Sequence, residues 1–276
     1  MEENKSGTID LHVHIFPDRM FEAVWKRFKS LGWGFQEEYI EQIRQTLIAH
    51  GVVRAAGLSY AHKAGVAGSL NRFMETLGRS DPMFLPFASV YPNDDDFRQT
   101  VDHAIESSHL YGFKFQPLAQ LFDVNDARLD YLYERCLERD FPITMHIGSG
   151  PTASELVGIN HFRKLIRRFE MLRICVPHMG WTEFDEFLRL MDDHPNMFFD
   201  TAVINIVDHR LDSRYPVPPQ RLARYADRIC FGSDWPFVHY DYQTSLDSVK
   251  RFGFSPEDCQ KVMYDNAVRF LKIDIT

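Results

Sequence analysis

Two histidines separated by one residue are the first side chains in this sequence that could do chemistry. They are His12 and His14, in the run Asp-Leu-His-Val-His at residues 10–14, where a β-rich segment ends. Side chains two apart on a strand share a face, so both imidazoles can reach one metal ion. The pair alone leaves two interpretations open, since two histidines can also simply cap a strand.

Three more polar residues follow later β-rich segments. His146 ends the run Pro-Ile-Thr-Met-His, His178 follows Cys-Val-Pro, and Asp234 lies in Gly-Ser-Asp-Trp-Pro. Histidine nitrogens with one carboxylate make a ligand set suited to Zn²⁺, Fe²⁺ or Mn²⁺. Such an ion lowers the pKa of a bound water toward neutrality and so supplies a nucleophile at pH 7.

These side chains can act together only if the fold brings the segment ends to one place. The β-rich segments, several of them almost continuously apolar as in a covered parallel sheet, lie at residues 8–16, 53–59, 83–90, 112–116, 142–147, 172–177, 197–202 and 228–232. Apolar residues three and four apart predict helices at residues 95–107, 129–139, 162–169, 184–193 and 243–251. Ser255 followed by Pro256 predicts the start of another helix, which runs to Leu271.

Eight strands alternating with helices in 276 residues predict an α/β fold, the (β/α)8 TIM barrel, as a single domain over residues 1–276. The competing doubly wound sheet needs a glycine-rich turn after its first strand, and this sequence has none there. In a barrel the carboxyl ends of the strands converge on one face, where active sites lie. We therefore expect the histidines and Asp234 to form one cluster.

Composition narrows the class of protein. Hydrophobic residues are 45% and charged residues 25%, which excludes disordered and fibrous classes. The net charge of −8 is unlike that of a nucleic-acid-binding protein. The sequence has no apolar run of about eighteen residues and no signal-peptide pattern. The four cysteines are far apart and form no CxxC pair, so we expect a cytoplasmic protein with reduced core thiols and no membrane partner.

The motifs together resemble a known family. Asp-x-His-x-His, the histidine after the fifth strand, His-x-Gly after the sixth and Gly-Ser-Asp-Trp-Pro after the eighth are similar to the amidohydrolase superfamily. The resemblance is closest to the amidohydrolase-related branch that includes aminocarboxymuconate-semialdehyde decarboxylase, and it extends from residue 8 to about residue 272. TatD-like nucleases and polymerase-and-histidinol-phosphatase-like phosphoesterases share the opening motif but not this ending.

The resemblance implies a site and a cofactor. It makes His12, His14, His146 and Asp234 the ligands of one divalent transition metal, Zn²⁺ with Mn²⁺ or Fe²⁺ as alternatives. It makes Asp234 the general acid–base, and His178 the residue that stabilises the developing oxyanion beside the metal.

The reaction stays open between two chemistries that need the same ligands. We expect a hydrolase that acts on a lactone, amide or similar bond of a small, carboxylate-bearing substrate. Non-oxidative decarboxylation of an aryl or vinyl carboxylic acid is the alternative. A metal-free barrel that serves as a binding protein is the third hypothesis.

Substrate contacts are expected from four residues. Lys114 and Arg210 could bind a carboxylate, and Trp181 and Trp235 could form walls of the pocket. By the same resemblance, Lys114 could instead be carboxylated and bridge two metals, and Arg210 could belong to a plain surface loop. The resemblance also allows a homodimer.

Overall fold

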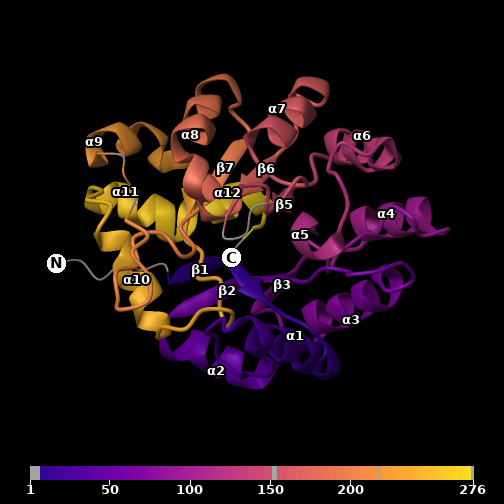
Figure 1. The fold of residues 1–276 in the computed structure, drawn as a ribbon, viewed down its shortest axis with the longest axis horizontal. Coiled ribbons are helices and arrows are strands. Elements are labelled where there is room, and N and C mark those ends of the chain that lie inside the picture. Colours follow the sequence, from indigo (N-terminus) through magenta and orange to yellow (C-terminus); the bar gives the residue numbers. More distant parts are fainter. Residues whose placement is uncertain (1–6, 151–153, 215, 217, 275–276) are drawn as a thin grey trace.

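Parallel strands form a ring at the centre of the computed structural model, with helices around them (Figure 1). The structure describes residues 7–150, 154–214, 216 and 218–274. Within these residues the strands are β1 (Thr8–His14), β2 (Val52–Leu58), β3 (Phe84–Pro86), β4 (Phe113–Phe115), β5 (Ile143–Met145), β6 (Ile174–Val176), β7 (Met197–Asp200) and β8 (Ile229–Cys230). Each falls on a predicted β-rich segment, and most are shorter than predicted because the apolar runs continue into buried loops.

The strands pair in two parallel groups, β1–β3 and β4–β8. Isolated parallel bridges join the groups into a ring: Ala88 pairs with Phe113, and Val13 pairs with Trp235. The amide of Leu11 also donates to the carbonyl of Phe231 at 2.9 Å, which closes β1 against the segment after β8. This closed parallel ring confirms the predicted (β/α)8 barrel.

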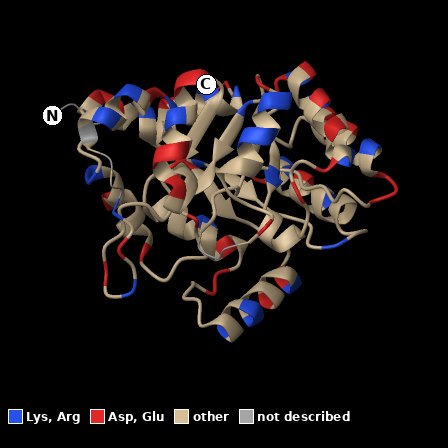
Figure 2. Ribbon diagram, turned by 45° about the horizontal axis from the view of Figure 1, so that its top comes forward, with Lys and Arg blue, Asp and Glu red and all other residues tan. Residues whose placement is uncertain are grey.

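The helices cover the outside of the ring. In chain order they are α1 (Asp18–Leu31), α2 (Ile40–Ala49), α3 (Ala67–Ser80), α4 (Phe97–Glu106), α5 (Pro117–Gln120), α6 (Asp130–Arg139), α7 (Ile159–Arg168), α8 (Phe184–Asp193), α9 (Pro219–Leu222), α10 (Tyr242–Lys250), α11 (Pro256–Gln260) and α12 (Asn266–Leu271), with a π-helical turn over Lys261–Asp265 between the last two. The ribbon in Figure 2 shows basic and acidic residues interleaved along the outer helices.

All the predicted helices are present, the last as α11, the π-helical turn and α12 in succession. The sequence patterns described above predict no helix in residues 17–52 and 60–82. That prediction was incomplete. α1, α2 and α3 occupy those stretches and bury apolar side chains three and four residues apart, such as Phe21 with Trp25 and Leu70 with Met74.

Alternate residues of β1 face the apolar core and the histidine side of the strand. Every residue from Ile9 to His14 is buried, as expected for a strand covered on both faces. Ile9, Leu11 and Val13 belong to the apolar core. His12 and His14 share the other face.

Three of the four cysteines, Cys136, Cys175 and Cys230, are buried, and all four carry free thiols. Among the described residues, we find no helix whose length and hydropathy would let it span a lipid bilayer.

Candidate metal centre

The strand ends bring the predicted histidines into one buried cluster. His14 is the last residue of β1, His146 follows β5 directly, and His178 lies two residues after β6. The ring centroids of His12 and His178 are 5.1 Å apart, and those of His146 and His178 are 4.9 Å apart. Each ring is within reach of another, as the barrel geometry requires.

Asp234 is the point on which the first-strand histidines converge. Its Oδ1 lies 2.9 Å from His14 Nε2 and 3.2 Å from His12 Nε2. The candidate ligand atoms of these three residues all lie within 4.8 Å of one another. The Asp234 side chain is 13% exposed, so the cluster opens to the outside through this residue.

His146 lies beside this group but not within it. Its Nε2 hydrogen-bonds to the carbonyl of Gly150 at 3.0 Å, and its Nδ1 lies 3.4 Å from Gln116 Nε2. The structure therefore brings His12, His14 and Asp234 together, with His146 adjacent to them through His178.

Asp200 is a further residue of the cluster, and the sequence analysis did not identify it. It ends β7 and is fully buried. Its Oδ2 lies 2.8 Å from His12 Nδ1, and its Oδ1 accepts the amide of His178 at 2.8 Å. An acidic residue at the end of an apolar strand was the available signal, but a single Asp has no motif spacing to mark it.

The hydrogen bonds of the His12 ring nitrogens indicate whether a metal ion would fit this cluster. A carboxylate accepts, so His12 donates from Nδ1 to Asp200, and its Nε2 then carries a lone pair. That lone pair faces the Asp234 carboxylate and, although it is buried, accepts no hydrogen bond from the described part of the chain. Two acceptor atoms at this separation repel each other unless a cation lies between or beside them. The donor set fits a divalent transition metal.

Burial keeps the cluster histidines neutral. It lowers the pKa of His12 and of His14 well below 6.5. It also lowers the pKa of His146 and of His178 to about 3. Metal binding needs neutral imidazoles, so these rings are ready to act as metal ligands or hydrogen-bond acceptors at pH 7.

Lys114 lies in β4 with no solvent exposure, and its ammonium makes no hydrogen bond to any residue that the structure describes. Burial lowers its pKa to about 8, although the charges of Asp200 and Asp234 act in the opposite direction. An unpartnered buried ammonium is costly, so an anion that reached it would be bound strongly.

A second buried carboxylate, Asp10, holds the two halves of the site together. Its Oδ1 accepts the amides of His12 at 2.9 Å and Ser233 at 3.1 Å. Its Oδ2 accepts the Tyr242 hydroxyl at 2.7 Å. Asp10 thereby ties β1 to the loop that carries Asp234.

A cavity of about 460 Å³ lies next to the cluster. It is lined by Gly32, Trp33, Gly34, Trp181, Val203, Arg210, Leu211, Phe237, Val238, His239 and Tyr240. Phe237 stacks on His14 at 4.5 Å between ring centroids, and Trp181 packs edge-on to His178 at 5.9 Å. The cavity wall is therefore in contact with the histidine cluster.

The substrate contacts expected from sequence separate into two groups. Trp181 and Arg210 line the cavity, and Arg210 sits on a loop held by Asp208, which accepts the Arg210 amide at 2.7 Å. Trp235 is not among the lining residues. Its indole is 4% exposed and donates to Glu38 at 2.8 Å.

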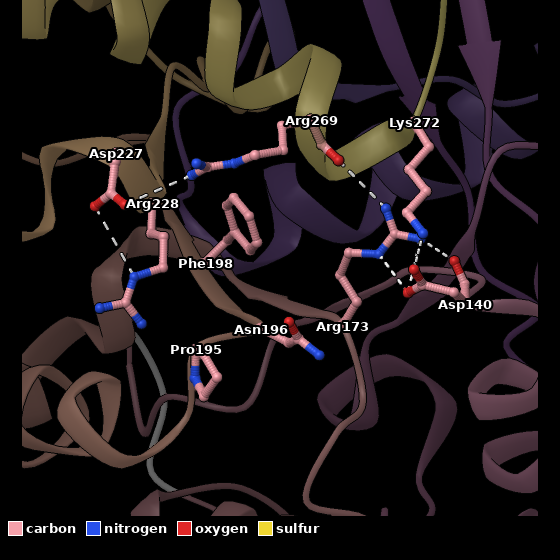
Figure 3. Close-up of a pocket in the computed structure, with 9 residues that line it drawn as sticks. All are labelled: Asp140, Arg173, Pro195, Asn196, Phe198, Asp227, Arg228, Arg269 and Lys272. Carbon is pink, nitrogen blue, oxygen red and sulfur yellow. Dashed lines mark hydrogen bonds and ion pairs between the residues drawn. The ribbon is translucent and has the colours of Figure 1, made fainter.

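A second cavity, of about 450 Å³, lies at the opposite end of the barrel (Figure 3). Its residues precede strands: Arg173 comes before β6 and Arg228 before β8. Arg173 donates to Asp140 at 3.0 Å and to the carbonyl of Phe270, and Lys272 also pairs with Asp140. These cations already pair with acceptors of the protein itself. We therefore interpret this cavity as a gap between packed elements and not as a binding site.

Comparison with protein families identifies the class. A family model described as Amidohydrolase matches residues 9–273. The protein belongs to the amidohydrolase family, whose enzymes are metal-dependent. A search of curated proteins finds no match.

Solved structures share the fold at low sequence identity. A 2,6-dihydroxybenzoate decarboxylase with bound 2,6-dihydroxybenzoate has a TM-score of 0.69 and 16% identity, over 97% of this chain and 100% of that chain. A Pseudomonas putida protein assigned as a 2-pyrone-4,6-dicarboxylic acid hydrolase has a TM-score of 0.65 and 16% identity, over 98% and 99%. A manganese-bound 5-carboxyvanillate decarboxylase from Novosphingobium aromaticivorans has a TM-score of 0.70 and 13% identity, over 99% of both chains. The barrel is thus shared by decarboxylases and hydrolases.

Proposed function

We propose that the protein is a metal-dependent hydrolase, with His12, His14, His146 and Asp234 as the ligands of one divalent ion. The observation that carries this proposal is the convergence of His12 Nε2 and His14 Nε2 on Asp234 Oδ1, at 3.2 and 2.9 Å. His146 joins the set when its ring leaves the Gly150 carbonyl. Zn²⁺ suits this nitrogen and oxygen set, and Mn²⁺ or Fe²⁺ are alternatives.

When bound, the ion would polarise the substrate carbonyl and lower the pKa of a water molecule toward 7. Asp234 is partly exposed beside the cavity, so its carboxylate can accept a proton and pass it to the leaving group. It is both ligand and general acid–base in this proposal.

His178 takes a different role from the one expected. A carbonyl only accepts, so the ring donates from Nδ1 to Ala202 O, 3.0 Å away. The neutral ring therefore has no proton on Nε2 with which to stabilise an oxyanion. We assign His178 Nε2 as a hydrogen-bond acceptor for water or a substrate hydroxyl in place of the oxyanion role.

The substrate class follows from two cations. Arg210 lines the cavity. Lys114 does not line it, but its buried ammonium has no hydrogen-bond partner among the described residues and lies close enough to Asp200 and Asp234 for their charges to raise its pKa. Trp181 and Phe237 offer aromatic walls. We propose a small carboxylate-bearing molecule with a lactone, amide or similar bond as substrate.

Non-oxidative decarboxylation of an aryl or vinyl carboxylic acid is the second candidate. The unpartnered ammonium of Lys114 favours it equally, since it would hold the carboxylate in either reaction. A neutral Asp234 would then protonate the carbon that loses CO₂.

Elemental analysis of the purified protein before and after chelation tests the ligand set. We expect about one equivalent of zinc or another transition metal. Two equivalents would favour a carboxylated Lys114 as a bridge between two metals. No metal, with failure to reload, would overturn the proposal and leave the metal-free binding barrel.

Assays on the loaded enzyme then separate the reactions. Lactones and amides are tested for hydrolysis, and aryl and vinyl carboxylic acids for CO₂ release. Asp234→Asn should reduce turnover at least about a hundredfold in whichever reaction is found. Near-normal turnover of this variant would contradict the role given to Asp234.

A further inference from the structure

Asp200 uses its two carboxylate oxygens for two different tasks. Oδ2 lies 2.8 Å from His12 Nδ1, on the side of the ring away from Asp234. Oδ1 accepts two backbone amides, from His178 at 2.8 Å and from Ala202 at 3.1 Å. The side chain is fully buried, so these bonds are not shared with solvent.

The Oδ2 contact decides which nitrogen of His12 carries the proton. With Asp200 as acceptor the proton is on Nδ1, and Nε2 keeps its lone pair toward His14 and Asp234. The opposite tautomer would direct an N–H bond at the metal position and would set two acceptors, Nδ1 and Oδ2, against each other in the interior.

The Oδ1 contacts fix the surroundings of His178. This residue has a backbone φ of 56°, a left-handed conformation that is uncommon outside glycine. Asp200 bonds to the amide of His178 itself, and to the amide of Ala202, whose carbonyl accepts His178 Nδ1–H at 3.0 Å. One carboxylate therefore positions both the backbone and the acceptor of His178.

We propose that Asp200 is a positioning residue that sets the tautomer of His12 for metal binding and holds His178 in place beside it. The metal part of this inference rests on the proposed function, because it takes His12 as a ligand. The tautomer of His12 is set without a metal, by the shorter of its two carboxylate contacts: 2.8 Å from Nδ1 to Asp200 against 3.2 Å from Nε2 to Asp234.

Asp200→Asn gives opposite expectations at the two oxygens. The amide oxygen of Asn can still accept from His178 and Ala202, whereas its NH₂ group would face His12 Nδ1 and donate to it. His12 would then carry its proton on Nε2, where a metal cannot bind. Loss of a residue that orients a metal-binding histidine weakens metal affinity about 10- to 100-fold.

The experiment is nitrogen–proton correlation NMR of metal-free protein labelled with ¹⁵N-histidine, with His12→Gln used to assign the His12 signals. We expect Nδ1–H for His12 and for His178 in the wild type. In Asp200→Asn, His12 should switch to Nε2–H while His178 keeps Nδ1–H. Competition with a chromophoric chelator should show the loss of Zn²⁺ affinity.

Asp10→Asn is the matched control. Asp10 is also a fully buried carboxylate that accepts backbone amides, but it contacts the amide of His12 and not its ring. This variant should leave the His12 tautomer as in the wild type. A switch in both variants would mean that general disturbance of the site, and not Asp200, moves the proton.

Two results would overturn the proposal: Nε2–H on His12 in the wild type, or an unchanged tautomer and Zn²⁺ affinity in Asp200→Asn. If the variant does not fold, the wild-type spectrum still decides. If the wild type has the expected tautomer but binds no metal, the proposed function fails while the role of Asp200 in setting the tautomer stands.

Discussion

Asp10 and Ser233 are 223 positions apart in sequence, yet the Ser233 amide donates to Asp10 Oδ1 at 3.1 Å. The same oxygen accepts the amide of His12, and Oδ2 accepts the Tyr242 hydroxyl. Asp10 therefore closes the barrel at the place where β1 and the loop after β8 supply the proposed metal ligands.

Replacing Asp10 with Ala should destabilise the protein severely. Two backbone amides and one hydroxyl would lose their acceptor in the interior, and each unsatisfied group costs about 1–3 kcal/mol. We expect urea denaturation to show a loss of at least about 3 kcal/mol in the free energy of unfolding. Tyr242→Phe removes only one of these bonds and should cost less, so an equal loss in both variants would contradict this account.

Acid should destabilise the metal-stripped protein through His146 and His178. Burial lowers the pKa of both from 6.5 to about 3 in the folded state. Between these values the unfolded chain binds more protons, so stability is full above pH 6.5 and falls as the pH decreases. Each histidine contributes a slope of about 1.4 kcal/mol per pH unit. Urea titrations at pH 7, 6 and 5 should give a smaller slope for His178→Gln, and identical slopes would refute the assignment.

Removing the buried charge of Lys114 should stabilise the protein and impair the enzyme. Lys114→Met eliminates an ammonium without a partner, and we expect roughly 1–3 kcal/mol of added stability at pH 7. The folded-state pKa of about 8 lies below the value of 10.5 for a free lysine, so the unfolded state binds more protons between them. Wild-type stability should thus rise toward the variant from pH 8 upward.

The same variant should raise KM for a carboxylate-bearing substrate more than it lowers kcat, because Lys114 binds the carboxylate in the proposed reaction. Lys114→Arg keeps the charge and serves as the control for KM. A less stable Lys114→Met protein would show that the ammonium has a partner after all.

Arg173 should be essential for docking the last helix. Its guanidinium donates to the carbonyls of Arg269 at 3.3 Å and of Phe270, at the end of α12, and to Asp140. Arg173→Met would leave the buried Phe270 carbonyl unpaired and remove the ion pair with the half-exposed Asp140, at a cost of about 3 kcal/mol. Hydrogen exchange should speed up selectively across α12.

Arg269→Met is the control variant at the same cavity. Arg269 is half exposed and lies 3.9 Å from Asp227, so its loss should cost less than about 1 kcal/mol. Equal exchange rates in the two variants would argue against an anchoring role for Arg173.

The barrel could be predicted because the sequence patterns that mark its strands and helices are local. Apolar runs mark the strands, and the ends of strands meet in a barrel, which places His12, His14, His146, His178 and Asp234 in one neighbourhood. The periodicity of α1–α3 was equally present in the sequence, at Phe21 and Trp25 for example, so those helices could have been predicted too.

Other features depend on contacts that no local pattern encodes. The role of Asp200 comes from its meeting with His12, 188 positions away in the chain. The proton on His178 Nδ1 is set by a backbone carbonyl, and Trp235 turns toward Glu38 and not into the cavity. Sequence spacing indicated which residues gather, whereas the orientation of their side chains required the folded structure.

The placement of the proposed ligands has a consequence for biosynthesis. His12 and His14 leave the ribosome early, whereas Asp234 follows the last strand of the barrel. A nascent chain can offer the histidine pair but not the complete set, so the full ligand set forms only when the barrel closes. Tight metal binding would then depend on completed folding.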